Sequence, residues 1–146
     1  MLTVRIRRLS PHVALPEYHT VGAAGFDLAA SEETRIEPGA VALVPTGLVI
    51  RVPDGYFLGV FARSSTPLRR GLIVSNGVGV IDADYCGATD EIKIQVMNVT
   101  REPVTVKAGD RIAQGLFIPV ARATWQEANE DLRDGSRGGF GATGLA

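Results

Sequence analysis

Cysteine is almost absent from the chain, because Cys86 is the only one among 146 residues. A single thiol cannot form a disulfide within one chain, and a reducing compartment is the simplest interpretation. Histidine is scarce as well, with 2 residues in all, and no cluster of cysteine and histidine predicts a zinc site. We therefore expect neither a disulfide scaffold nor a zinc domain.

Long apolar runs and an excess of one charge are also missing. Residues 1–10 (MLTVRIRRLS) lack the apolar core of a secretory signal, and no stretch approaches the length that spans a membrane. The formal net charge is −1, so no overall field directs the chain to nucleic acid or to a membrane surface. We predict a cytoplasmic protein that binds neither, although a small anionic ligand would need only local positive charge.

The residues that are present favour β-structure almost throughout. Residues 2–9 (LTVRIRRL) alternate apolar and polar side chains, and residues 56–62 and 91–99 are rich in β-branched or aromatic ones. Turn signals recur at short intervals, at residues 37–39 (EPG), 45–47 (PTG), 53–55 (PDG), 75–77 (SNG) and 107–110 (KAGD). This pattern predicts one all-β domain, a jelly-roll barrel or sandwich.

Helical signals are few. The best candidate is a turn or two at residues 66–71 (TPLRRG), where Pro67 suits a first turn. Residues 124–132 (TWQEANEDL) fit either a short helix or an irregular strand. The chain therefore offers at most short helical pieces within a β domain.

The C-terminal segment differs from the rest. Residues 134–146 are rich in glycine and hold one aromatic residue, Phe140, and such a segment cannot bury enough surface to order itself. Its composition favours a frayed tail, whereas Phe140 together with Arg137 also suits a flap that orders on a ligand. We accordingly divide the chain into a domain at residues 1–133 and a C-terminal segment at residues 134–146.

The most unusual stretch is residues 77–87 (GVGVIDADYCG). It places the carboxylates Asp82 and Asp84 close together, with Tyr85 directly behind them. Glycines such as Gly79 permit close approach of bare backbone groups to the edge of a planar base. Asp82 could hold a water molecule and remove its proton, and Tyr85 could pack against a sugar. A plain turn between two strands is the alternative, and for this stretch alone it is favoured.

Three further stretches carry polar residues of possible function. Residues 62–67 (ARSSTP) combine Arg63 with two serine hydroxyls, which suits a phosphate chain or an ordinary surface turn. Gln114 in residues 109–114 (GDRIAQ) needs partners if it is buried, and these could be a ligand or the backbone. Asp27 in residues 22–30 (GAAGFDLAA) is either a paired structural acid or a contact to water on a hydrated cation.

Taken together and in order, these stretches resemble the five motifs of the trimeric deoxyuridine triphosphatase (dUTPase) family. The five stretches are AGFDLAA, ARSSTP, NGVGVIDADYCG, GDRIAQ and RGGFGATG, and they span residues 24–144. The resemblance implies an all-β jelly-roll barrel (β-clip) that forms a homotrimer, with active sites shared between subunits and a flexible glycine-rich flap at the C-terminus. It also implies Mg²⁺-dependent hydrolysis of dUTP to dUMP and pyrophosphate by attack of water on the α-phosphate. This activity keeps uracil out of DNA and supplies dUMP for dTTP synthesis.

The same resemblance implies a role for each matching residue. Asp82 is implied as the acid that activates the attacking water, and Asp27 as the acid that contacts water on Mg²⁺, which the triphosphate mainly holds. The implied substrate-binding positions are Arg63, Ser64, Ser65, Asn76, Gly79, Val80, Ile81, Tyr85, Lys93, Gln114, Arg137, Phe140 and Gly141.

The chain departs from the family pattern at three places. Ser65 stands where many members have glycine. The flap arginine often lies further upstream of the aromatic residue than Arg137 does, which leaves Arg133 as an alternative. Residues 88–91 (ATDE) lengthen the stretch after Gly87, and we expect them to form a solvated bulge.

Two alternatives belong to different classes. A dCTP deaminase shares the fold but needs a glutamate three residues before an asparagine; aligned on Asn98, this chain has Gln95, whose amide cannot shuttle protons. A catalytically inactive trimer with a regulatory or structural role is the other. The intact set of Asp82, Tyr85, Gln114 and Phe140 argues against it.

Overall fold

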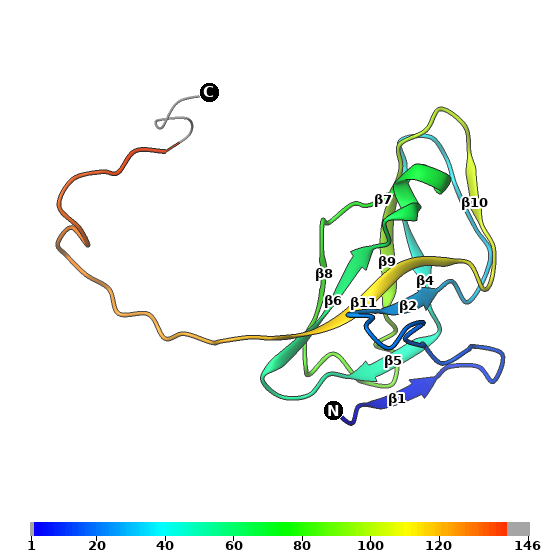
Figure 1. Ribbon diagram of the computed structural model, residues 1–146, viewed down its shortest axis with the longest axis horizontal. Helices are drawn as coiled ribbons and strands as arrows, with labels where there is room; N and C mark the ends of the chain where they lie inside the picture. Colours follow the sequence, from blue (N-terminus) through cyan, green and yellow to red (C-terminus); the bar gives the residue numbers. More distant parts are fainter. Residues whose placement is uncertain (1, 140–146) are drawn as a thin grey trace.

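The computed structural model describes residues 2–139, and within them the chain is almost entirely β-structure (Figure 1). The strands are β1 (Arg5–Arg8), β2 (Phe26–Ala29), β3 (Thr34–Ile36), β4 (Val41–Pro45), β5 (Leu48–Arg51), β6 (Tyr56–Ala62), β7 (Leu72–Val74), β8 (Gly79–Ile81), β9 (Lys93–Asn98), β10 (Val104–Val106) and β11 (Arg111–Pro119). One short helical turn, η1 (Thr66–Arg70), follows β6. The predicted all-β fold is confirmed.

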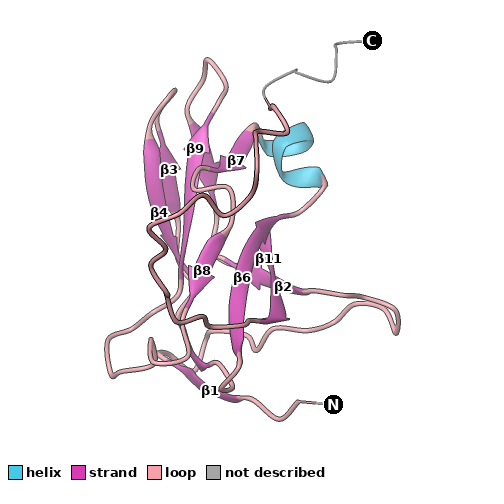
Figure 2. Ribbon diagram, turned by 90° about the vertical axis from the view of Figure 1, so that its left-hand side faces the viewer, coloured by secondary structure: helices cyan, strands magenta, loops and turns pink. Residues whose placement is uncertain are grey.

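The strands form four small antiparallel sheets that enclose one core. The largest has the order β2-β11-β6-β8, and a three-stranded sheet has the order β4-β9-β7. Two-stranded sheets, β1-β5 and β10-β3, complete the body. Figure 2 shows the four-stranded and three-stranded sheets beside each other, with β8 between β6 and the β4-β9 side.

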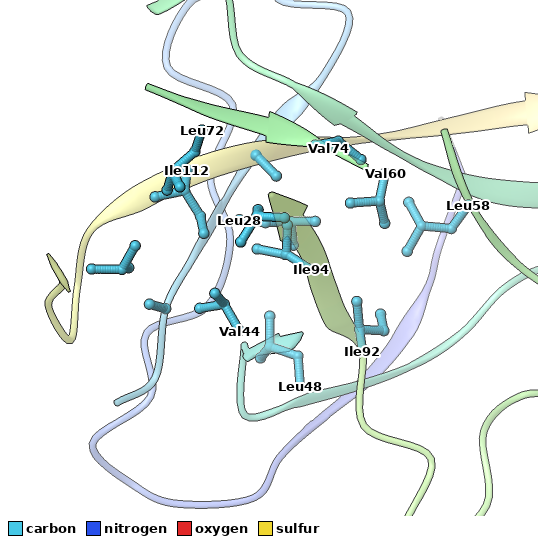
Figure 3. Packing of buried hydrophobic residues seen from close by; sticks show 14 of the residues in the cluster. Leu28, Val44, Leu48, Leu58, Val60, Leu72, Val74, Ile92, Ile94 and Ile112 are labelled. Carbon is cyan, nitrogen blue, oxygen red and sulfur yellow. The ribbon is translucent and has the colours of Figure 1, made fainter. Parts of the chain in front are cut away.

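The core is made by strands that turn alternate residues inward. On β9, Ile94 and Val96 are fully buried while Gln95 and Met97 face outward. Figure 3 shows Ile94 beside Leu28 of the larger sheet, and Val96 and Leu58 belong to the same buried cluster. Burial of such aliphatic side chains contributes roughly 1.5–3 kcal/mol each, which is the main force that holds the sheets together.

Asn98 is the most deeply buried polar residue, and its amide has a full set of partners. Its Nδ2 donates to the carbonyl oxygens of Ile36 and Glu102, at 3.0 and 2.8 Å. Its Oδ1 accepts from the backbone N–H and the hydroxyl of Thr100, at 2.8 and 2.7 Å. This asparagine therefore ties the end of β9 to β3 and to the turn before β10, and we assign it a structural role.

The expectations for individual elements had mixed outcomes. The strand at residues 56–62 is confirmed as β6, and the short helix near residues 66–71 is confirmed as η1, with Pro67 in its first turn and Gly71 closing it at φ 63°. The strand expected at residues 2–9 covers only Arg5–Arg8. It is shorter because its pairing partner β5 has only the matching residues Leu48–Arg51.

Residues 121–139 form an arm that leaves the body after β11 (Figure 1). Residues 124–132 are neither helix nor strand, so both interpretations of that stretch were wrong. The arm is exposed along its described length, and its large apolar side chains Trp125 and Leu132 are 95% and 91% exposed. No part of the described chain buries them, which removes the packing energy that would fix a helix or strand.

Among the described residues, no helix has the length and apolar character needed to cross a membrane.

Candidate functional site

Asp27 on β2 lies at the centre of a cluster of basic side chains. Its Oδ1 is 2.8 Å from Nε of Arg63, which follows β6, and its Oδ2 is 3.1 Å from both Arg111 at the start of β11 and His19. Its side chain is only 13% exposed, so these charges are screened less than surface pairs are. The paired interpretation of Asp27 therefore agrees with its surroundings.

The pairing of Asp27 is incomplete in one respect. Oδ2 is buried and accepts no well-aligned hydrogen bond from the described residues, although two basic groups lie 3.1 Å away. A carboxylate oxygen of this kind retains a free lone pair that a water molecule could use.

Gln114 on β11 lies beside Asp27, because the register pairs Gln114 with Asp27 on one side and with Phe61 on the other. Its amide nitrogen donates to the carbonyl oxygen of Ala62 at 3.0 Å. Its Oε1 lies next to Gly25, where a Cβ atom would approach to 3.1 Å and would also meet Leu116 at 2.8 Å. The amide nitrogen of Gln114 thus provides a partner for a backbone carbonyl, as expected for a buried amide. The absence of a side chain at Gly25 leaves room for the amide oxygen of Gln114.

The segment after β6 is held by two anchors. The buried hydroxyl of Thr66 donates to the carbonyl oxygen of Ile112 at 2.8 Å. Arg70 pairs with Asp110 at 2.7 Å, and the Asp110 carboxylate also accepts the N–H of Lys107 at 2.9 Å. The Arg70 hydrogen bond holds the pKa of Asp110 below its ordinary value, with smaller help from Lys107. These contacts fix the chain around Ser64 and Ser65 against the start of β11.

The predicted hairpin lies on β8, which pairs with β6 through Gly79 opposite Val60 and Ile81 opposite Leu58. A Cβ atom at Gly79 would lie 3.0 Å from Cβ of Val60, so glycine permits this close approach of the two strands. Gly77 has φ 73°, in the left-handed region that favours glycine. Gly77 and Gly79 therefore allow the backbone conformation and the close strand packing of the hairpin.

Asp82 and Tyr85 stand in the tight turn after β8. The N–H of Tyr85 donates to the carbonyl oxygen of Asp82 at 3.2 Å, and the Tyr85 hydroxyl donates to the carbonyl oxygen of Glu91 at 3.2 Å. Tyr85 is 41% exposed. Asp82 is exposed, and within residues 2–139 no basic group pairs with it. Its carboxylate is thus open to solvent and available as a base.

The longer stretch after Gly87 is not the solvated bulge that we expected. Asp90 accepts the N–H of Gly87 at 2.6 Å, and Glu91 accepts the N–H of Gly47 at 2.7 Å. Both acids are half-buried and bind backbone donors. Asp90 closes the stretch on itself, and Glu91 fastens it to the turn before β5, because these N–H groups would otherwise lack partners.

The structure brings some of the predicted residues together and separates others. Asp27, Arg63 and Gln114 form one group, which we call the Asp27 group. Asp82 and Tyr85 form another with β8, which we call the hairpin group. Ile81 lies opposite Leu58, whereas Gln114 contacts Ala62 further along β6. Four residues of strand separate these points, which is about 13 Å.

The remaining predicted residues are spread around the hairpin group and the arm. Asn76 is exposed in the turn before β8, Val80 is 59% exposed, and Lys93 is exposed at the start of β9. Arg137 and the alternative Arg133 are exposed on the arm, away from both groups. Phe140 and Gly141 lie outside the described residues.

Sequence reasoning missed two basic residues that lie against Asp27, which are Arg111 and His19. Arg111 was inside the GDRIAQ stretch without an assigned role, and His19 lies in a loop with no recognisable motif. In the sequence, His19 lies 8 positions and Arg111 lies 84 positions from the carboxylate that both approach. The only available signal was that Arg111 begins a strand on which Gln114 is the next polar residue. Period-two alternation shows which residues share a face of a strand, but it does not show which strand lies beside them.

The chain is similar in sequence to known proteins of one family. The dUTPase family model matches residues 12–144, which include all five stretches quoted above. A deoxyuridine 5'-triphosphate nucleotidohydrolase of Desulfitobacterium hafniense is 48% identical over 136 residues, covering 90% of this chain and 88% of the relative. The protein of the same name from Anaeromyxobacter is 44% identical over 148 residues, covering 98% of both chains.

Solved structures show the same fold. The crystal structure of dUTPase from Streptococcus mutans is similar with a TM-score of 0.76 and 37% identity, covering 84% of this chain and 98% of that chain. A Staphylococcus bacteriophage 80alpha dUTPase with dUpNHpp is similar with a TM-score of 0.87 and 23% identity, covering 99% of this chain and 100% of that one. The second likeness concerns the fold alone.

Proposed function

This chain belongs to the dUTPase family, and we propose that it is a dUTP diphosphatase, which hydrolyses dUTP to dUMP and pyrophosphate. The observation that carries the proposal is the family match over residues 12–144, which includes every stretch to which a role is assigned. The dCTP deaminase alternative is not favoured: Gln95 binds the hydroxyl of Ser75 at 3.0 Å and offers no carboxylate for proton transfer.

Asp82 is the proposed general base. It removes a proton from the water that attacks the α-phosphorus, while the bond to the bridging oxygen breaks and pyrophosphate leaves. Its exposure and its lack of a basic partner in the described chain support this role, since a carboxylate already bound to an arginine is a weaker proton acceptor. A single weak base suffices because phosphoryl transfer depends mostly on positioning and charge stabilisation.

The hairpin group is the proposed base and sugar subsite. The edge of uracil would form hydrogen bonds with backbone groups of Gly79, Val80 and Ile81, with Asn76 beside them. The close approach of β8 to β6 at Gly79 supports a closely packed backbone behind this edge. A pocket closed around uracil would leave no room for the methyl group of thymine. The half-exposed ring of Tyr85, held through its hydroxyl by Glu91, would pack under the deoxyribose and exclude a 2′-hydroxyl.

The Asp27 group is the proposed phosphate subsite. Arg63 is oriented by Asp27 through Nε, and its Nη1 donates to the carbonyl oxygen of Arg111 at 3.2 Å, which leaves Nη2 of its guanidinium for phosphate oxygens. Hydroxyl and amide contacts to the phosphates would come from Ser64, Ser65 and Gln114. Further positive charge would come from Lys93 and Arg137. Residues 134–146 are the proposed flap, with Phe140 stacking on uracil and Gly141 beside it, so that closure would exclude water.

Mg²⁺ fits this chain only as an ion held mainly by substrate. No group of three or more acidic, histidine or cysteine side chains within residues 2–139 could ligate a metal ion by itself. Asp27 Oδ2, which has a free lone pair, is the residue that would accept a hydrogen bond from a metal-bound water. The ion would supply neutralisation of the charge that develops on the leaving pyrophosphate.

The proposed active site needs more than one copy of the chain. Asp82 and Gln114 must both approach the α-phosphate, but the register of β6 keeps them about 13 Å apart or more within one chain. In a homotrimer, one copy could supply the hairpin group and another copy the Asp27 group, which would bring Asp82 and Gln114 to the same phosphate.

Exposed apolar surface supports such an assembly. Val41, Met97 and Ile73 lie in register across the outer face of β4, β9 and β7. Val41 is 56% exposed and Ile73 is 37% exposed. A contiguous apolar row of this kind, together with the exposed Trp125 of the arm, is typical of a surface that another subunit covers.

Pyrophosphate release from dUTP, dTTP, dCTP and UTP, each with and without Mg²⁺, tests the proposal. We expect release from dUTP alone, dependent on Mg²⁺, and loss of roughly 100- to 10,000-fold in turnover for Asp82→Asn with dUTP binding retained. Ammonia released from dCTP would support the deaminase instead. Full turnover by Asp82→Asn would remove Asp82 as the base.

A further inference from the structure

A second concave site lies beside the hairpin, on the sheet formed by β1 and β5. It is a cavity of about 340 Å³ lined mainly by Arg5, Arg7, Arg51, Cys86 and Ala88. We call it the arginine pocket. Its walls come from β1 and β5, which run side by side at the lower end of the body in Figure 1, and from the loop that follows Tyr85.

The positive charge of the arginine pocket is not neutralised by the described chain. Arg5 lies directly opposite Arg51 in the β1-β5 register, and like charges at that position repel each other. Arg7 is two residues further along β1, on the same face as Arg5. None of the three pairs with an acid among residues 2–139, and no acidic residue lines the cavity.

Arg7 is held in place by an uncharged partner. Its guanidinium donates a hydrogen bond to the carbonyl oxygen of Ala88. This contact orients the side chain toward the loop that follows the hairpin but leaves its charge uncompensated. Asp90 accepts the N–H of Gly87 and Glu91 accepts the N–H of Gly47, and in the described chain neither acid forms an ion pair with any of the three arginines.

We propose that the arginine pocket binds a small multivalent anion of the phosphate class. Three guanidinium groups around one cavity match the several oxygens and multiple charges of a phosphate or pyrophosphate group, because each planar fork can hold two such oxygens. A monovalent carboxylate would leave most of this charge uncompensated. The proposal does not depend on the proposed function, because none of these residues belongs to the hairpin group or to the Asp27 group.

Cys86 makes the pocket directly measurable, because it lines the cavity and is the only cysteine in the chain. Its thiol is half-buried, so alkylation by iodoacetamide reports on the pocket alone. The probe is pyrophosphate without Mg²⁺. If the anion covers the thiol, a concentration ten times its Kd should slow alkylation of the wild-type chain by about tenfold.

Two variants and one control assign the effect to the pocket. Arg51→Gln and Arg5→Gln should each weaken protection of Cys86 by pyrophosphate at least about tenfold, since a charge-assisted contact contributes roughly 1.5–3 kcal/mol. Arg101→Gln removes the same charge from an exposed loop outside the cavity and should leave protection unchanged. Pyrophosphate bound at the active site would protect Cys86 equally in all four proteins.

The proposal is overturned by any of four results. The first is an alkylation rate that pyrophosphate does not change. The second is equal protection in the wild type and in Arg51→Gln, which would place the anion elsewhere. The third is a Cys86 thiol that does not react in the folded protein, which would mean that the pocket is covered. Loss of protection in Arg101→Gln as well would show a response to total charge and would also contradict it.

Discussion

The ion pair between Asp27 and Arg63 should stabilise the fold measurably, and its coupling can be isolated. A cycle of Asp27→Asn, Arg63→Gln and the double variant removes the pair from either side. The Nε–Oδ1 distance is 2.8 Å, and the two side chains are 28% and 13% exposed. Close contacts of this kind couple by roughly 0.5–3 kcal/mol, and partial burial puts this pair at about 1–2 kcal/mol.

The chain provides a matched control in Arg35 and Glu37. Their Nε–Oε1 distance is 2.7 Å, nearly the same, but their side chains are 62% and 58% exposed. Solvent screening should reduce their coupling to about 0.5 kcal/mol or less. The two pairs therefore have nearly the same Nε-to-oxygen distance and differ strongly in burial.

Urea unfolding of each variant, followed by circular dichroism, gives the free energies for both cycles. The expected result is a coupling at Asp27–Arg63 that clearly exceeds the coupling at Arg35–Glu37. Equal couplings would refute the reasoning, because burial would then add nothing. A coupling at Asp27–Arg63 near zero would also refute the view that Asp27 orients Arg63 for phosphate.

Three other predictions test separate parts of the account. Removing residues 134–146 should strongly lower turnover of dUTP while leaving the melting temperature within about 2 °C, because the described part of that segment touches no core residue; unchanged kinetics would make it a frayed tail. Gly115→Ala should destabilise the fold by about 1–3 kcal/mol, because a Cβ there would lie 2.5 Å from the ring of Phe26, and an unchanged urea midpoint would contradict this packing. The pKa of Asp110 is lower in the folded state, so the stabilisation that this carboxylate provides is complete above the unfolded-state pKa and is lost as pH falls through the folded-state pKa. The difference in unfolding free energy between wild type and Asp110→Asn should therefore narrow between pH 5 and pH 3. A difference that stays constant over this range would contradict the role of Asp110.

The sequence predicts local structure well where a segment meets its partners along its whole length. Residues 56–62 form β6 as expected because β11 and β8 flank them and bury Leu58 and Val60. Residues 2–9 alternate just as clearly, yet only four of them find a partner on β5. Alternation shows which face is apolar, but the length of a strand depends on its neighbour.

Partners that are distant in sequence were beyond prediction. Gln114 was expected to satisfy either a ligand or the backbone, and only the register of β11 against β6 shows that it donates to Ala62. Asp90 and Glu91 were expected in solvent because their charges suit a surface loop, but two backbone N–H groups lie within their reach. The arm at residues 124–132 carries helix-compatible residues and has nothing in the described chain to pack against.

The central claim is that one active site combines Asp82 of one copy with the Asp27 group of another. Mixing Asp82→Asn chains with Arg63→Gln chains, unfolding them together and refolding them tests this most directly. Each parent should be nearly inactive, and random assembly should restore about a quarter of wild-type dUTP hydrolysis, because a quarter of the sites would then receive both intact residues. A mixture no more active than its parents would show that both residues of a site come from the same chain.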